Sequence, residues 1–293
     1  MKKVILLTLA AVCTLHLSYA QELKAYQIYN EKGKAVSFGK MIKQLSKYDV
    51  VLFGEFHNNS INHWLELKTA GALYRQTDSN LILGAEMFER DNQDAVNRYL
   101  TARTDADQLA EEARLWPNFK TDYQPLLDFA KQHHLNFVAT NIPRRYAAVV
   151  AKYGMDSLSK LPAAEKKYMA ELPVKVDLAT PGYKEMEAMM KDHAGDKVMN
   201  FISAQAMKDA TMAKSIYNIR KKGTLFLHFN GNYHSKEHGG IYWYLMKEKK
   251  WLQKLKVAVI SVDLSDNEQL SLPDDAQLTE FNIVLPEDMT TTY

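Results

Sequence analysis

Short runs of β-branched and aromatic residues recur along this chain, and they constrain its fold more than any other feature. Residues 50–53 form the clearest run, since all four are apolar and the run is short. A run of this kind is typical of a strand that is buried on both faces of a parallel sheet. Similar strand-like runs occupy residues 81–84, 136–140, 224–229, 257–262 and 281–285.

Segments with the apolar spacing of helices lie between most of these runs. In residues 198–222, apolar side chains recur mostly at intervals of three and four residues, and Gly223 then ends the pattern. Ser60 is a suitable cap for another helix, which extends to about Gln76. Strands that alternate with helices predict an α/β fold with a mainly parallel sheet and helices on both of its faces.

Polar side chains follow three of the predicted strands at the point where each strand ends. They comprise three glutamates, one arginine and two histidines, namely Glu55, Glu86, Glu89, Arg90, His57 and His234. Because the carboxyl ends of parallel strands meet at one sheet edge, where such folds bind their ligands, we expect these side chains to converge. Buried carboxylates require a counter-charge, and Arg90 is its expected source.

Chemical and structural roles both remain open for this polar set. Two imidazoles with carboxylates can bind a transition metal, or they can act as base and acid. A histidine after a strand can instead be a hydrogen-bonded turn residue. Acidic residues such as Glu89 can simply begin a helix, whose amino end favours negative charge. The metal-ligand set is not defined by spacing, because the residues are far apart in the sequence.

Residues 154–197 differ in character from the rest of the chain. Three prolines interrupt them, charged residues are dense, and the apolar residues are mainly methionine and tyrosine. Methionine side chains adapt well to flat apolar surfaces. We therefore expect a helical cap inserted at 154–197 into an α/β core domain that comprises residues 21–153 and 198–293.

The first 20 residues have the three-part pattern of a secretory signal peptide. Lys2 and Lys3 precede a short apolar run at residues 4–12, and small residues lie near Ala20. We therefore expect an exported protein of the periplasm or cell envelope. Lipid anchoring through Cys13 is the alternative, although Val12 is bulkier than the residue that usually precedes an acylated cysteine.

The charge balance argues against one class of partner. The chain has 37 basic and 35 acidic residues, and loss of Lys2 and Lys3 with the leader leaves 35 of each. A protein that binds nucleic acid needs a net or clustered positive field. We therefore expect no nucleic-acid partner.

Six ordered motifs resemble those of the ChaN family. They are Val-Leu-Phe-Gly-Glu-Phe-His-Asn-Asn at 51–59, Ala-Glu-Met-Phe-Glu-Arg-Asp-Asn-Gln at 85–93, Asp-Tyr-Gln-Pro-Leu at 122–126, Asn-Ile-Pro-Arg at 141–144, Gln-Ala-Met-Lys-Asp-Ala-Thr-Met-Ala at 205–213 and Gly-Asn-Tyr-His at 231–234. The family comprises exported, iron-regulated haem-binding proteins. It belongs to a wider superfamily that also contains Tiki-type proteases and erythromycin-esterase-like hydrolases. Six motifs in order are far more specific than any one of them.

The resemblance implies an α/β core with a helical insertion, haem as the cofactor and a role in haem or iron acquisition. It also implies that Glu55, His57, Glu86, Arg90 and His234 match the polar site of the superfamily. In hydrolytic relatives, such residues act as acid, base or metal ligand. A hydrolase, metal-assisted or not, is therefore the alternative function. Haem binding is favoured, because the chain lacks a Gly-x-Ser-x-Gly nucleophile motif.

The resemblance also directs attention to the cap and its surroundings for contacts with haem. Tyr183, Tyr168 and Tyr146 are the tyrosines considered, since tyrosine can ligate haem iron. Arg144 and Lys184 are expected near the propionates, where local cations suffice. An exposed apolar pocket would favour a homodimer around the ligand, and outer-membrane haem-uptake components are expected partners.

Overall fold

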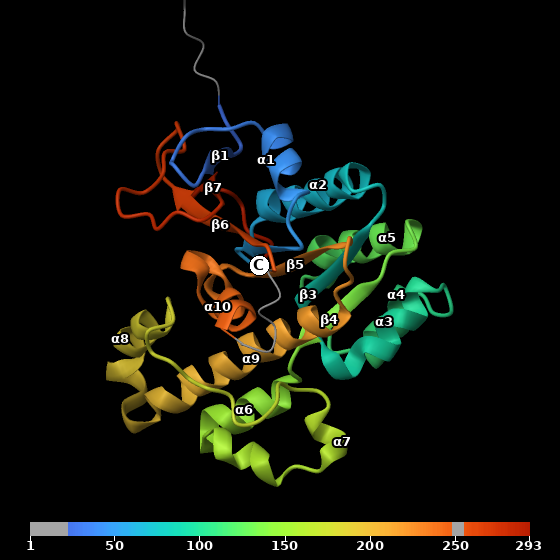
Figure 1. Ribbon diagram of the computed structural model, residues 1–293, viewed down its shortest axis with the longest axis vertical. Coiled ribbons are helices and arrows are strands. Elements are labelled where there is room, and N and C mark those ends of the chain that lie inside the picture. The colour runs from blue at the N-terminus through green and yellow to red at the C-terminus, as the bar shows by residue number, and fades with distance from the viewer. Residues whose placement is uncertain (1–22, 248–254) are drawn as a thin grey trace, which may run out of the picture.

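The structure is a computed structural model that describes residues 23–247 and 255–293 (Figure 1). The predicted signal peptide at residues 1–20, with Cys13, lies outside the described residues. Within the described chain, seven strands form one sheet. They are β1 (Gln27–Asn30), β2 (Val50–Glu55), β3 (Leu81–Glu89), β4 (Phe137–Asn141), β5 (Leu225–Gly231), β6 (Val257–Ser265) and β7 (Phe281–Pro286).

The strands lie side by side in the order β1-β7-β6-β2-β5-β3-β4. All neighbouring pairs are parallel except β1 and β7, which confirms the predicted mainly parallel sheet. Strand β2 lies between β5 and β6, so the chain crosses β2 when it passes from β5 to β6. A reversal of this kind opens a crevice at the carboxyl ends of the strands, where α/β proteins bind ligands.

Strand β2 shows why its sequence is a continuous apolar run. Val51 and Phe53 pack into the core on one face of the sheet, whereas Val50 and Leu52 pack into the core on the other face. All four side chains are fully buried. Successive side chains of a strand point to opposite faces, so a strand covered on both sides needs apolar residues at every position.

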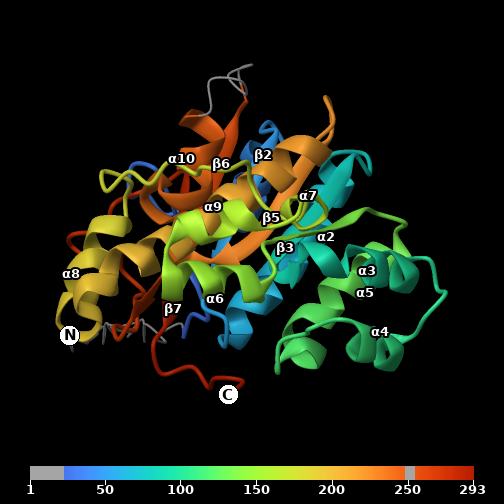
Figure 2. The ribbon, with the colours of Figure 1, turned by 90° about the horizontal axis from the view of Figure 1, so that it is seen from below.

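Helices cover both faces of the sheet, as predicted (Figure 1). One face carries α1 (Phe38–Leu45), α2 (Ser60–Gln76), α3 (Gln93–Leu100), α4 (Ala106–Glu112) and α5 (Gln124–Gln132). The other face carries α6 (Arg144–Tyr153), α9 (Val198–Ile219) and α10 (Gly240–Lys247). Helices α6 and α9 pack against each other in Figure 2. Helix α9 ends at Ile219, three residues before the predicted end, and α2 is capped by Asn59 rather than by Ser60.

The segment 154–197 is less helical than expected. It contains the short helices η3 (Met155–Lys160), α7 (Ala163–Lys166) and η4 (Gly195–Lys197), and the longer α8 (Tyr183–Ala194). Residues 167–182 form irregular chain between α7 and α8. The segment packs on the face that carries α6 and α9 (Figure 2). Its prolines and its sparse aliphatic residues account for the irregular stretch.

Strand β3 extends to Glu89, five residues beyond the predicted end. Met87 and Phe88 remain buried in the core, and the pairing of β3 with β4 shifts register between Ala85 and Glu89. Glu86 therefore belongs to a strand and not to the start of a helix. Glu89 precedes η1 (Arg90–Asn92), but its side chain makes no capping hydrogen bond.

None of the helices in the described ranges is both long enough and apolar enough to cross a membrane.

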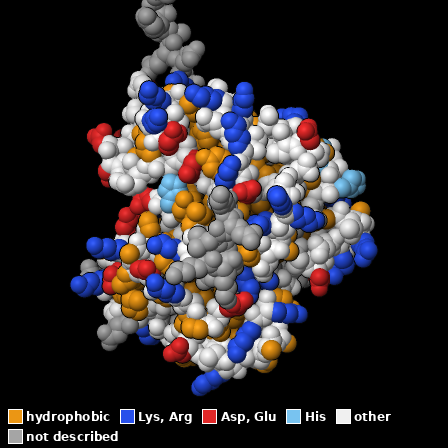
Figure 3. All heavy atoms as spheres, viewed as in Figure 1, with side chains coloured by type: hydrophobic (Ala, Val, Ile, Leu, Met, Phe, Trp, Pro, Cys, Tyr) orange, Lys and Arg blue, Asp and Glu red, His pale blue; other side chains and the backbone are white. Residues whose placement is uncertain are grey.

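On the face of the molecule shown in Figure 3, lysine and arginine side chains are interspersed with acidic ones.

Candidate functional site

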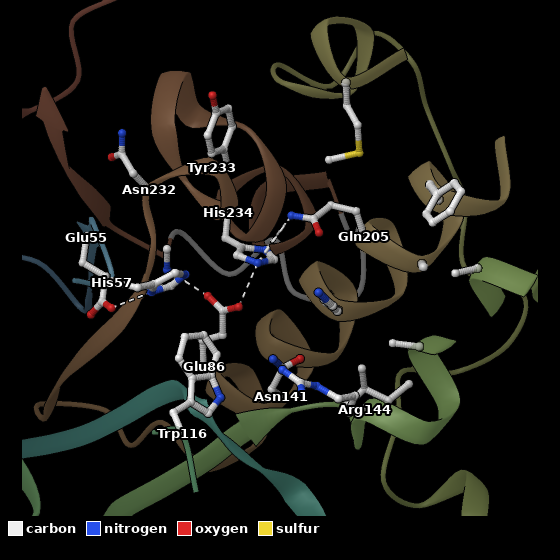
Figure 4. A pocket seen from close by; sticks show the side chains of 18 of the residues that line it. Glu55, His57, Glu86, Trp116, Asn141, Arg144, Gln205, Asn232, Tyr233 and His234 are labelled. Atoms are coloured by element: carbon white, nitrogen blue, oxygen red, sulfur yellow. Dashed lines mark hydrogen bonds and ion pairs between the residues drawn. The ribbon is translucent and has the colours of Figure 1, made fainter. Parts of the chain in front are cut away.

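A cavity of about 820 Å³ lies at the carboxyl ends of β2, β3 and β5. Its polar side is formed by Glu55, His57, Glu86 and His234 (Figure 4). Its apolar side is formed by short side chains of α6, two methionines of α8, part of α9 and one tryptophan. These residues are Ala147, Ala148, Ala151, Met186, Met190, Phe201, Ala204 and Trp116.

Glu55 and His57 form one half of the polar side. The Nδ1 atom of His57 lies 2.7 Å from Oε1 of Glu55, and the hydroxyl of Tyr123 donates to the same oxygen over 2.8 Å. Burial opposes ionisation of Glu55, but the hydrogen bond from His57 lowers the net pKa of Glu55. Burial likewise lowers the pKa of His57, but the hydrogen bond and charge of Glu55 raise the net value. The pair is therefore a carboxylate with a cationic or readily protonated imidazole.

The ring of His57 retains access to the cavity. Its side chain is 32% exposed, and the edge of the ring meets Trp116 at a centroid distance of 4.7 Å. No hydrogen bond from Nε2 to another group is found in the described chain. His57 therefore presents one uncommitted nitrogen near the ligand space.

His234 lies in a different setting, between two buried carboxylates, of which Figure 4 shows that of Glu86. Its Nε2 lies 3.0 Å from Oε1 of Glu86, and its Nδ1 contacts Oδ1 of Asp209. Burial lowers the pKa of His234, but the charges of Glu86 and Asp209 and their hydrogen bonds raise it to about 10. Burial raises the pKa of Glu86, but the charge of His234 brings it far below its usual value. His234 is thus an imidazolium at neutral pH, with both nitrogens engaged.

Two further contacts hold the carboxylates around His234. Tyr183 donates its hydroxyl proton to Oδ2 of Asp209 over 2.6 Å, and the backbone N–H of Gly231 donates to Oε2 of Glu86 over 2.8 Å. The arrangement is fully buried and highly connected. Such a network fixes one geometry, because loss of any member leaves a buried charge unpaired.

Gly231 and Asn232, at the end of β5 and just after it, hold the turn in place. The Asn232 side chain pairs with the backbone of Val262, accepting from N–H over 3.0 Å and donating to C=O over 2.9 Å. This contact ties the turn to β6. At Gly231, an added Cβ would lie 2.7 Å from Nε2 of His57. Glycine therefore allows the imidazole and the turn to approach each other.

Four of the predicted polar residues converge, as expected: Glu55, His57, Glu86 and His234. Glu89 also lines the cavity, but its partner is Arg114, whose Nε donates to it over 2.8 Å. Arg90 does not join the cluster. Its guanidinium donates to Ser215 over 2.6 Å and to the carbonyl of Lys167 over 3.1 Å. The expected counter-charge is supplied by His234 and Arg114 instead.

Most of the residues expected to contact haem lie elsewhere. Tyr183 and Tyr146 are buried, and their hydroxyls bond to Asp209 and Arg145 respectively. Tyr168 lies outside the cavity, where Lys167 stacks on its ring. Lys184 is exposed and does not line the cavity. Only Arg144 is placed as expected, on the cavity wall.

Several cavity residues were not singled out from the sequence. They are Trp116, Gln205, Lys208 and Tyr233 on the wall, and Asp209 behind His234. Lys208 and Asp209 lie within one of the six motifs, and Tyr233 lies within another. The motifs therefore contained these positions, but sequence alone did not separate them from neighbours that serve packing.

The chain belongs to a family of haem-binding proteins. A family model described as haem-binding uptake, Tiki superfamily, ChaN matches residues 41–245, which is most of the chain. The resemblance stated from the six motifs is thereby confirmed.

Solved structures share the fold. The structure described as cofacial heme binding to ChaN of Campylobacter jejuni has a TM-score of 0.67 and 18% identity, over 89% of this chain and 96% of that chain. The type III effector HopBA1 and the erythromycin esterase EreC each give a TM-score of 0.47, with 14% and 12% identity. HopBA1 aligns over 85% of this chain and 92% of its own, and EreC over 90% and 83%.

A curated relative matches only a part of the chain. The chloroplastic protein RETICULATA-RELATED 5 of Arabidopsis thaliana is 28% identical over 86 residues, or 29% of this chain. The match spans 12% of that protein's own length.

Proposed function

We propose that this protein binds haem in the cavity at the carboxyl ends of β2, β3 and β5. The observation that carries the proposal is the pairing of an apolar wall with cations in one space of about 820 Å³. This volume is in the range of about 300–1,000 Å³ that small-molecule sites occupy. A porphyrin requires an apolar surface for its ring, cations for its propionates and a ligand for its iron. The cavity offers all three.

Tyr233 is the proposed iron ligand. Its side chain lines the cavity and is 54% exposed, and no hydrogen bond from its hydroxyl is found in the described chain. Phenolate oxygen is a known axial ligand of haem iron. His234 cannot serve, because Glu86 and Asp209 engage both of its nitrogens. Tyr183 donates its hydroxyl proton to Asp209 behind His234, so Tyr233 replaces it in this role.

Arg144 and Lys208 are the proposed partners of the propionates. Both line the cavity, on α6 and α9 respectively. The charge of Lys208 also helps to lower the pKa of Glu86, so this cation lies near the polar side of the cavity. A guanidinium or ammonium group binds a carboxylate through short, charge-assisted hydrogen bonds. His57 contributes a third donor on the opposite side of the cavity.

We further propose that two copies of the chain assemble around the ligand. Met189, Met199 and Phe201 are exposed large apolar residues on α8 and α9, near the apolar wall. Exposed apolar surface beside a ligand site favours self-association. The cofacial heme binding for which the Campylobacter jejuni ChaN structure is described is consistent with ligands that face each other.

Export and haem or iron acquisition complete the proposal. The leader pattern at residues 1–20 supports export to the periplasm or cell envelope, either with cleavage or with a lipid on Cys13. Outer-membrane haem-uptake components are the proposed partners. The hydrolase alternative is not favoured, because the family model that matches the chain is one of haem-binding uptake.

Haem titration of the purified protein tests the proposal. We expect a shifted Soret band that persists in His57→Ala, whereas Tyr233→Phe changes the spectrum and weakens binding by about tenfold or more. Tyr153→Phe is the matched control, because Tyr153 is 64% exposed and lies outside the cavity. Absence of a Soret shift in the unaltered protein would refute haem binding. Loss of the band only in His57→Ala would assign the iron to His57.

A further inference from the structure

A second cluster of buried polar side chains lies behind the cavity, between β2 and α2. It consists of Glu55 on β2 and of His63 and Glu66 on α2. All three are buried, and one ligand-type atom from each lies within 4.8 Å of the other two. Glu55 also lines the cavity, so the cluster is connected to the ligand space.

Two carboxylate oxygens in this cluster have no hydrogen-bond partner. They are Oε2 of Glu55 and Oε1 of Glu66, and both are inaccessible to solvent. No lysine or arginine forms an ion pair with either glutamate in the described chain, since their ion pairs are with His57 and His63. Burying such oxygens without compensation costs several kcal/mol per ionised group. In the described chain, the positive charge beside these carboxylates comes from His57 and His63, and neither ring contacts Oε2 of Glu55 or Oε1 of Glu66.

The contacts of His63 locate the missing charge. Its Nε2 lies 3.1 Å from the carbonyl oxygen of His57 and 3.5 Å from Oδ2 of Asp122, both of which are acceptors. In a neutral His63, a hydrogen on Nε2 satisfies them and leaves Nδ1 with a lone pair. That lone pair faces Oε2 of Glu66 at 3.1 Å, so two acceptors meet. A cation between them would resolve the conflict.

We propose that Glu55, His63 and Glu66 bind a divalent first-row transition-metal ion. The ligands are Nδ1 of His63 and one oxygen from each carboxylate. Imidazole with carboxylates suits Zn²⁺, Mn²⁺ or Fe²⁺. A ligating histidine typically donates its other ring N–H to a carbonyl or carboxylate, and His57 and Asp122 take these positions here.

The competing possibility is that protons, rather than a metal, fill the cluster. Burial and the charge of Glu55 raise the pKa of Glu66 well above its usual value, which favours the protonated form when no metal is bound. A neutral Glu66 can share its proton with Glu55. In that case the protein has no affinity for divalent ions at this position. Titration with a divalent metal ion therefore distinguishes a cluster filled by protons from one that binds a metal.

Calorimetric titration of chelator-treated, haem-free protein with Zn²⁺ and with Mn²⁺ is the first test. We expect one site per chain, with affinity lowered by more than about 100-fold in Glu66→Gln and by about tenfold in Asp122→Asn. Glu280→Gln is the matched control, because Glu280 also pairs with a histidine, His238, but lies outside the cluster. Unchanged affinity in Glu66→Gln, or no binding by the unaltered protein, would overturn the proposal.

Glu86→Gln distinguishes this site from the polar side of the cavity. We expect Glu86→Gln to retain the ion, and its loss there would place the metal beside His234 and overturn the assignment. Anomalous diffraction from crystals of the unaltered protein with Zn²⁺ gives a test that needs no variant to fold. The peak should lie about 2.0–2.2 Å from Nδ1 of His63 and from an oxygen of each glutamate. A peak elsewhere, or none, would refute the site.

Discussion

The two histidines of the cavity, His57 and His234, follow neighbouring parallel strands, yet their chemical states differ. His57 has one carboxylate partner, Glu55, and its side chain is 32% exposed. His234 has two, Glu86 and Asp209, and its side chain is 7% exposed. The difference shows that the number of carboxylates and the degree of burial decide whether an imidazole can act on a ligand.

This contrast assigns different tasks to the two halves of the polar side. The half around His234 is a closed network in which every nitrogen and most oxygens are engaged, so its role is to hold the turn after β5 against β3. The half around His57 keeps one nitrogen uncommitted and faces the ligand space. Stability therefore depends chiefly on His234, whereas His57 is the histidine that remains able to contact a ligand.

Replacement of each histidine by glutamine should give the largest difference in the free energy of unfolding between the two halves of the polar side. Glutamine can donate one hydrogen bond to Glu55 in place of His57, but it cannot supply the positive charge that Glu86 and Asp209 share. We expect His234→Gln to lower the free energy of unfolding by about 5 kcal/mol, since two buried carboxylates lose their partner. His57→Gln should cost about 1 kcal/mol. Urea unfolding followed by circular dichroism measures both values, and equal losses would contradict the contrast.

Stability should also depend on pH through His234. Its pKa is about 10 in the folded protein and 6.5 in the unfolded chain, so its contribution is complete below pH 6.5 and is lost as the pH rises to about 10. We expect a fall of slightly more than 1 kcal/mol per pH unit over this interval, or roughly 4 kcal/mol in all. The pKa of Glu86 is lowered, so its contribution is complete above its ordinary value of 4.5 and is lost under acidic conditions.

Urea unfolding at a series of pH values between 6.5 and 9.5 measures this dependence. His57→Gln should retain most of the slope, because its single partner raises the pKa of His57 less decisively than two partners raise that of His234. A slope that disappears in His57→Gln and survives in His234→Gln would show that His57 titrates in this range instead of His234. A flat profile for the unaltered protein would reject the imidazolium.

The sheet and the convergence of four polar residues could be predicted from the sequence for a simple reason. Strands buried on both faces are continuous apolar runs, and polar residues that follow them must lie at the shared edge. Glu55 and His57 show this directly, since β2 ends at Glu55. The length of β3 could not be predicted, because Glu86 interrupts the apolar pattern while its carboxylate accepts from the backbone of Gly231.

The partners of the polar residues could not be predicted, because they depend on tertiary packing. Arg90 follows β3 but turns to Ser215 on α9. Asp209 lies in a helix, where an acidic residue ordinarily faces solvent, yet it is fully buried against His234. Tyr183 belongs to the segment expected to contact haem, but its hydroxyl supports Asp209. Periodicity shows which face a residue occupies and leaves its partner undetermined.

Gly231→Ala should produce a small effect and sharpen the comparison, because the added Cβ would lie closer to His57 (2.7 Å) than to Glu86, the partner of His234 (3.4 Å). An alanine Cβ would lie 2.7 Å from Nε2 of His57, so the ring must shift while its Nδ1 is bonded to Glu55. We expect a loss of about 1–2 kcal/mol in the free energy of unfolding. The pH dependence due to His234 should remain.

Gly39→Ala is the matched control for this substitution, since an added Cβ there meets no atom within 4 Å and the residue lies inside α1. Alanine in a helix interior stabilises relative to glycine by about 0.5–1 kcal/mol, so the two variants should shift stability in opposite directions. Urea unfolding at pH 6 compares them. If Gly231→Ala left the free energy of unfolding unchanged, the imidazole of His57 would have room to move. Close packing would then not restrict its ring.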